Sequence, residues 1–160
     1  MASADTFNGA KNAFTFFYAY LNAVAQEIGM ERAIALDAKM CEMMGTAQGQ
    51  AMKDQVGIDE IDLVMAASLA VRSIDEALGI SSEVIEEGAQ RIASRVGRCP
   101  VYEAAQALGM DTAGIEAMCR ASALRYMDTM VKQLNPHLSY RLSEFRSSAD
   151  GYCVEEVVLG

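Results

Sequence analysis

The spacing of apolar residues changes at Ser81, and this change constrains the fold more than any other feature of the sequence. Before Ser81, apolar side chains recur every three or four positions, which is the period of an amphipathic helix. After Ser81, alternation over about 83–87 and 90–97 predicts a β-hairpin. The sequence therefore predicts a helical part over residues 1–79 and an α+β part over residues 80–160, joined in one compact domain.

Three helices are expected in the first part, over about 7–28, over 30–55, and from Asp59 or Asp62 to about 78. The first has an apolar seam whose residues alternate at spacings of three and four. The seam consists of Phe7, Ala10, Phe14, Phe17, Leu21, Val24 and Ile28. This seam packs either within the chain or against a second copy, so a homo-oligomer through residues 7–28 stays open.

The second predicted helix contains two glycines and a cysteine. Gly45 and Gly49 permit a close approach of another helix, because glycine has no Cβ. Cys41 lies among several methionines and is interpreted as a buried structural thiol.

Two helices are expected after the first hairpin. Pro100 begins one that runs to Leu108-Gly109, and the other runs from about 111 to 134. Alternation over about 138–142 and 152–158 then predicts a second hairpin with a turn at Ala149-Asp150-Gly151. The predicted fold is α+β, with N-terminal helices followed by a four-stranded antiparallel sheet of two hairpins and two intervening helices.

The net charge of −9 disfavours nucleic acid as a partner, because phosphate binding needs clustered Lys and Arg and the chain has only 13. No segment reaches the roughly 18 consecutive apolar residues of a membrane span. The first 28 residues lack the basic start of a signal peptide. These features predict a soluble cytoplasmic protein.

Four cysteines without a signal peptide indicate free thiols, or metal-binding or catalytic roles, in preference to a disulfide framework. Cys99 comes directly before the helix that begins at Pro100, where backbone N–H groups favour a thiolate and lower its pKa. Arg98 and Arg95 add positive charge nearby. Cys99 is therefore the candidate nucleophile, with a buried inert thiol as the alternative.

Cys119 lies within the predicted 111–134 helix and Cys153 begins the last strand. Together with Cys99 they would form a thiolate-rich metal site of zinc type, if the fold brings them together. A further ligand would come from Asp128, Glu103 or His137. The chain has no CxxC pair, so no local motif supports this site.

Arg91, Arg95 and Arg141 share the polar phase of their strands. A solvated sheet face is the simpler interpretation. If a further layer covers that face, these guanidiniums would instead bind a small carboxylate.

One series of motifs in the second part resembles a known family. The motifs in this series are Arg98-Cys99-Pro100, Glu103, Leu108-Gly109, Cys119, Asn135-Pro136 and Asp150-Gly151-Tyr152-Cys153. In this order they resemble the L-2-amino-thiazoline-4-carboxylic acid hydrolase family over about residues 80–160. They are also reminiscent of 4-vinyl-reductase-type small-molecule-binding domains.

The resemblance implies that water opens a small thiazoline ring to give a carbamoylated cysteine. It marks Cys99, Cys119 and Cys153, with Glu103 and Arg98 beside the first. The predicted catalytic residues are therefore the three cysteines and Glu103, and the predicted substrate-binding residues are Arg98, Arg95 and Arg141. The alternative function is a non-enzymatic small-molecule- or metal-binding module, acting as a sensor or accessory protein.

Overall fold

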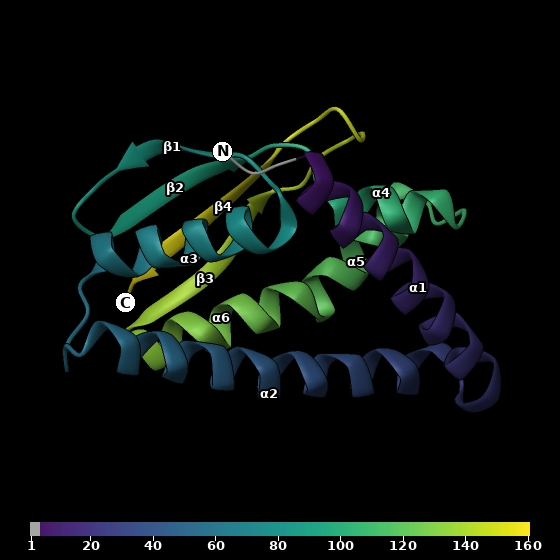
Figure 1. Cartoon of the computed structure of the whole chain (residues 1–160), viewed down its shortest axis with the longest axis horizontal. Coiled ribbons are helices and arrows are strands. Elements are labelled where there is room, and N and C mark those ends of the chain that lie inside the picture. The colour runs from purple at the N-terminus through teal and green to yellow at the C-terminus, as the bar shows by residue number, and fades with distance from the viewer. Residues whose placement is uncertain (1–3) are drawn as a thin grey trace.

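The computed structural model describes residues 4–160 (Figure 1). Its first elements are the helices α1 (Ala4–Ile28), α2 (Met30–Val56) and α3 (Leu63–Leu78), so the three predicted helices are confirmed. Asp62 caps α3, because its side chain accepts a hydrogen bond from the Met65 backbone N–H at 2.8 Å. Within residues 4–160, no helix is long and apolar enough to cross a membrane.

Four antiparallel strands form the sheet. The first hairpin contains β1 (Ser82–Glu87) and β2 (Arg91–Val96), and the second contains β3 (Leu138–Glu144) and β4 (Cys153–Leu159). The strand order is β1-β2-β4-β3, so the two hairpins join where β2 pairs with β4. The predicted α+β fold class is confirmed. The predicted turn of the second hairpin lies within a longer loop between Glu144 and Cys153.

Three helices connect the hairpins, where two were predicted. They are α4 (Pro100–Ala107), α5 (Thr112–Ala121) and α6 (Ala123–Leu134). The helix predicted over 111–134 is interrupted at Ser122, whose φ of −124° and ψ of −71° lie outside the helical region. Because of this interruption, α5 contacts α4 while α6 lies against α2 and β3.

The helices form layers on one face of the sheet (Figure 1). Helices α3 and α6 contact the sheet, α2 lies along α6, and α1 packs on α4 at one end. The largest fully buried side chains are Ile61, Met130, Leu134, Leu138, Val131 and Pro100. The main hydrophobic cluster contains residues from both sides of position 80, so the helical part and the sheet share a core.

The apolar seam of α1 packs within the chain. Leu21 is buried in a cluster that also contains residues of α4 and α5. Phe14 and Phe17 pack against this cluster, and their rings meet edge to face at 6.4 Å. Phe16 and Tyr20 lie off the seam and remain exposed. The intrachain interpretation therefore accounts for the seam.

Helix α2 approaches α6 closely, as its glycines predict. A Cβ added at Gly45 would overlap the carbonyl oxygen of Tyr126, and one at Gly49 would overlap that of Met130. Both glycines are buried. The position of α2 on α6 therefore depends on the absence of side chains at these two positions.

Candidate functional site

A polar pair interrupts the covered, apolar face of the sheet. On β4, the side chains of Cys153, Glu155 and Val157 point to the same face, because side chains alternate along a strand. Val157 belongs to the core that contains residues of α3 and α6. Glu155 pairs across the strands with Ser94, which is itself buried. Glu155 and Ser94 therefore lie on the side of the sheet that the helices cover.

Cys99 occupies the N-cap position of α4 and packs against two hydrophobic clusters. Burial raises the pKa of its thiol to about 11, although the backbone N–H groups of Tyr102 and Val101 and the charge of Arg146 lower it. The predicted place at a helix N-terminus is confirmed, but the predicted low pKa is wrong because burial outweighs the helix terminus. The Cys99 thiol therefore keeps its proton at neutral pH.

Cys119, on α5, interacts electrostatically with the other two cysteines. Burial raises the pKa of its thiol, and the charges of Glu155, Cys99 and Cys153 raise it further. Electrostatic interactions weaken with distance, so these four side chains belong to one region of the fold. We call Cys99, Cys119, Cys153 and Glu155 the thiol cluster. The fold thus assembles residues from α4, α5 and β4 that no local motif connects.

Glu155 is the acidic member of the thiol cluster. Burial raises the pKa of its carboxyl, against the hydrogen bond from Tyr140 and the charge of Arg146, which lower it. The Tyr140 hydroxyl donates to Glu155 Oε2. Burial and the charge of Glu155 raise the pKa of Tyr140 well above its ordinary value, so the phenol keeps its proton at neutral pH. A half-buried carboxyl of raised pKa, held by a phenol, is suited to general acid–base chemistry.

Arg146 supplies positive charge beside the thiol cluster from the loop between β3 and β4. It is only 2% exposed. Its Nε donates to Cys153 Sγ at 3.3 Å. Its other nitrogens donate to the backbone carbonyls of Gly151, Val96 and Gly97, at 3.1, 3.3 and 2.5 Å. These bonds tie the loop to the end of β2 and orient the Cys153 thiol.

The predicted zinc-type site is not formed. Among residues 4–160, no three His, Cys, Asp or Glu side chains are arranged to hold a metal ion, and this includes Cys99, Cys119 and Cys153. Asp128, a predicted further ligand, instead accepts hydrogen bonds from Lys132 and from a backbone N–H of β3. The guanidinium beside Cys153 also disfavours a second cation there.

Glu103 and Arg98 form a separate ionic site, so the structure does not bring them into the thiol cluster. Glu103 accepts hydrogen bonds from Arg98 Nη2 at 2.6 Å and from Lys11 Nζ at 2.9 Å. Burial raises the pKa of Glu103, but these bonds and charges outweigh it and lower the pKa. The three side chains line a hollow of about 290 Å³ that none of the cysteines lines.

Arg95 and Arg141, which were predicted to bind substrate, lie on the opposite face of the sheet. In the strand register Arg95 pairs with Val154, and Arg141 pairs with Glu156. Paired residues share a face, so both arginines point away from the thiol cluster. Both are exposed, and Arg95 lies 4.7 Å from the ring centre of Tyr152. The helices cover the other face, so the solvated interpretation holds.

The model of the L-2-amino-thiazoline-4-carboxylic acid hydrolase family matches residues 10–142. The chain belongs to this family. The match extends through the N-terminal helices, beyond the region that the sequence motifs suggested. Cys99 and Cys119 lie within it, whereas Cys153 and Glu155 follow it. Family membership supports a function of the L-2-amino-thiazoline-4-carboxylate hydrolase type.

Two solved structures have the same fold at low sequence identity. The phenol-responsive sensory domain of the transcription activator PoxR, with phenol, gives a TM-score of 0.61 at 13% identity, over 91% of this chain and 74% of that one. A trafficking protein particle complex subunit 3 from Naegleria fowleri, covalently bound to palmitic acid, gives a TM-score of 0.57 at 11% sequence identity. That match covers 94% of this chain and 96% of the other. No curated protein matches the sequence of this hydrolase family member.

The sequence prediction missed Glu155, Tyr140 and Arg146. Glu155 could have been predicted as a site residue from the sequence, because it is an acidic residue in the same strand phase as Cys153 and Val157. An acid on the covered face of a strand is costly unless it is partnered, so that phase marks a candidate site. Arg146 carried no comparable signal, because its burial depends on a loop conformation.

Proposed function

We propose that this protein hydrolyses a thiazoline ring of the L-2-amino-thiazoline-4-carboxylate type at the thiol cluster. The family supplies the substrate class. One observation supports the location: the half-buried Glu155 interacts with the Cys99 and Cys119 thiols from the covered face of the sheet. Cys99 is the nucleophile in this proposal, because backbone N–H groups and Arg146 favour its thiolate.

The first step forms a covalent intermediate. Glu155 accepts the Cys99 proton, and the sulfur attacks the ring carbon that lies between the ring sulfur and the two nitrogens. The bond between that carbon and the ring sulfur then breaks. The proton on Glu155 passes to the departing sulfur, so the ring opens to a free thiol and Cys99 carries an isothiourea.

The second step releases the product. Glu155 takes a proton from water as the water oxygen attacks the same carbon. The bond to Cys99 breaks. Of the two water protons, the one on Glu155 returns to the Cys99 sulfur and the other passes to the nitrogen that carried the double bond. The net reaction adds one water to the substrate and gives the N-carbamoyl derivative of cysteine.

Tyr140 and Arg146 act as positioning residues in this proposal. The Tyr140 hydroxyl fixes one oxygen of Glu155, which leaves the other for proton transfer. Arg146 holds Cys153 and the ends of the loop, and its charge lowers the pKa of Cys99 against the effect of burial.

The direct test is incubation of the purified protein with L-2-amino-thiazoline-4-carboxylate. We expect new thiol groups to appear in a colorimetric assay, together with a product that is one water heavier by mass spectrometry. Heat-treated protein is the control. If a folded preparation forms neither thiol nor product, the proposed reaction is wrong.

Replacing Glu155 with glutamine should lower kcat/KM by about 10²- to 10³-fold, because it removes the proton acceptor. A base must be ionised to act, so wild-type activity should rise as pH increases through the pKa of Glu155. Since burial raises that pKa above its ordinary value, this rise should occur at higher pH than for an exposed glutamate.

The matched control is Glu156→Gln, one position along β4 on the opposite face, where the carboxylate pairs with Arg91 at 3.3 Å. It should keep the wild-type pH profile. A Glu155→Gln protein that retains the acid limb of the profile would assign the proton transfer to another group.

A second function is binding of a small apolar molecule without chemistry. It is favoured by the phenol and the palmitic acid named for the two structures of the same fold. This chain has an open cavity of about 820 Å³ between α3 and the β1–β2 hairpin, lined in part by Val71, Ile80 and Val84. Native mass spectrometry of the purified protein should then detect a copurifying ligand, and Val71→Arg should abolish its binding.

We also propose that the protein is cytoplasmic. All four cysteines are free thiols. Free thiols persist in the reducing environment of the cytosol. Cell fractionation with an antibody against the protein tests this location, and recovery in a secreted fraction would contradict it.

A further inference from the structure

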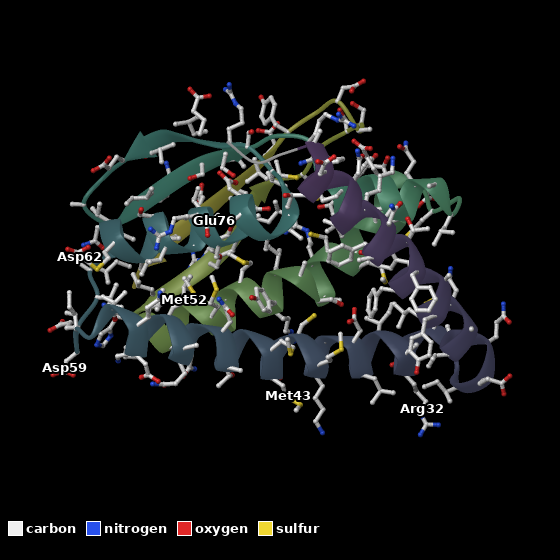
Figure 2. The ribbon with its side chains drawn as sticks, viewed as in Figure 1. Arg32, Met43, Met52, Asp59, Asp62 and Glu76 are labelled. Atoms are coloured by element: carbon white, nitrogen blue, oxygen red, sulfur yellow. The ribbon has the colours of Figure 1, made fainter. Side chains whose placement is uncertain are left out.

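The outer face of α2 carries an exposed apolar stripe. Leu36, Met40, Met43 and Met44 are 58%, 45%, 67% and 58% exposed. Their spacings of four, three and one place them along one side of the helix. Figure 2 shows Met43 pointing away from the body of the molecule. Isolated exposed apolar side chains are ordinary, but a continuous row of four large ones marks an interaction surface.

Helix α2 cannot bury this stripe by rotating within the chain. Its opposite side is fixed on α6, where Gly45 and Gly49 meet the backbone of Tyr126 and Met130 without room for a Cβ. The stripe is therefore a second face of the helix that is available to another molecule.

The charges around the stripe specify which molecule fits. Arg32 and Asp54 lie at equal separations in sequence on either side of Met43, about three helical turns away. This separation returns each charge to the side of the helix on which Met43 lies, and Figure 2 shows Arg32 and Met43 projecting on that side. Both charged residues are exposed.

A second copy of the chain, placed antiparallel, satisfies this pattern. Two α2 helices related by a two-fold axis at Met43 would set Arg32 of each copy against Asp54 of the other. A parallel arrangement would instead set Arg32 against Arg32 and Asp54 against Asp54, which is repulsive. The 27 residues of α2 make the helix, and so the contact between the two copies, about 40 Å long.

We propose that the protein forms a homodimer through an antiparallel pairing of α2 about Met43. An anionic membrane surface fits the stripe less well, because membrane-binding helices are rich in Lys and Arg and this protein carries a net charge of −9. The dimer does not depend on the hydrolase reaction, and the two proposals are tested separately.

Sedimentation velocity over a concentration series tests the stoichiometry. The wild-type protein should sediment as a dimer at micromolar concentration. Met43→Glu should raise the dissociation constant by at least roughly 30-fold, because it places two carboxylates together at the centre of the interface. A wild-type monomer at these concentrations would overturn the proposal.

A charge exchange tests the antiparallel register. Arg32→Glu and Asp54→Arg should each weaken the dimer, since each creates like-charge pairs across the axis. The double variant restores opposite charges and should recover most of the wild-type affinity. If both single variants dimerise as the wild type does, or the double variant is weaker than both, the register is wrong.

A cross-linking comparison separates this surface from α1. Met43→Cys should form a disulfide-linked dimer under mild oxidation, because the two-fold axis brings the residue next to its own copy. Phe16→Cys, on the exposed side of α1 at 78% exposure, is the matched control and should not. Wild-type protein reports any cross-linking through native cysteines. If Phe16→Cys forms the cross-linked dimer and Met43→Cys does not, the interface lies on α1 and the proposal for α2 is wrong.

Discussion

Replacing Cys99 with alanine is expected to lower kcat/KM for L-2-amino-thiazoline-4-carboxylate by about 10³-fold or more, the largest loss among the four cysteines. The thiol lies at the N-terminus of α4, where the N–H groups of Val101 and Tyr102 and the charge of Arg146 favour its anion. The pKa of Cys119 is raised by burial and by interactions with Glu155, Cys99 and Cys153, and the charge of Arg120 lowers it only in part. Steady-state kinetics of the purified variants measures the difference.

Two controls make this result interpretable. Cys41→Ala removes a thiol whose pKa burial and Asp37 raise to about 12 and which lies outside the thiol cluster, so it should leave turnover unchanged. Cys99→Ser keeps the size of the side chain but removes the reactive sulfur, and should be nearly as inactive as Cys99→Ala. Full turnover in Cys99→Ser would exclude the covalent intermediate and leave direct attack by water with Glu155 as the base.

Mass spectrometry gives a readout that a purely structural role of Cys99 would not produce. Protein quenched during turnover should carry the mass of the substrate on the peptide that contains Cys99. Glu155→Gln should reduce the rate at which this adduct forms, because the thiol then loses its proton acceptor. An adduct on Cys119 instead would reassign the nucleophile within the thiol cluster.

Replacing Gly45 with alanine is expected to lower the free energy of unfolding by about 3 kcal/mol. The added Cβ would overlap the carbonyl oxygen of Tyr126 on α6, so the two helices would have to move apart and would lose packing along their contact. This steric cost opposes the gain of about 1 kcal/mol that alanine brings to a helix interior. Urea denaturation followed by circular dichroism measures the change.

Gly9→Ala is the matched control for this experiment. Gly9 lies inside α1, and a Cβ there meets no atom within 4 Å. The substitution should therefore stabilise the protein by about 0.5 to 1 kcal/mol through helix propensity alone. If Gly45→Ala is as stable as Gly9→Ala, α2 and α6 are not in backbone contact at Gly45.

The element types could be read from the sequence because their signals are local. The seam of α1, the cap at Asp62, the proline that begins α4 and the alternation in β2 each depend on residues within a few positions. The α+β class and both hairpins followed from these signals. The close approach of α2 to another helix also followed, since a glycine inside a helix leaves space that a partner can occupy.

The break at Ser122 could not be predicted, because it depends on contacts with residues that are distant in sequence. The apolar spacing continues through it, and Ser122 is acceptable within a helix. The direction of α6 is set instead by its packing on α2 and β3, which are remote in sequence. The helical spacing of apolar residues therefore predicted helix on both sides of Ser122, but it could not show that these residues form two helices.

The amino-acid sequence by itself determined which segments are helices and strands, and which cysteine begins a helix. Only the tertiary structure decided the chemistry of the site. The pairing of β2 with β4 and the burial of Arg146 bring Cys153 and Glu155 to the region of Cys99. Burial then reverses the pKa shift that the α4 terminus alone predicts for Cys99. Desolvation depends on every atom around a group, and most of those atoms belong to residues far away in the sequence.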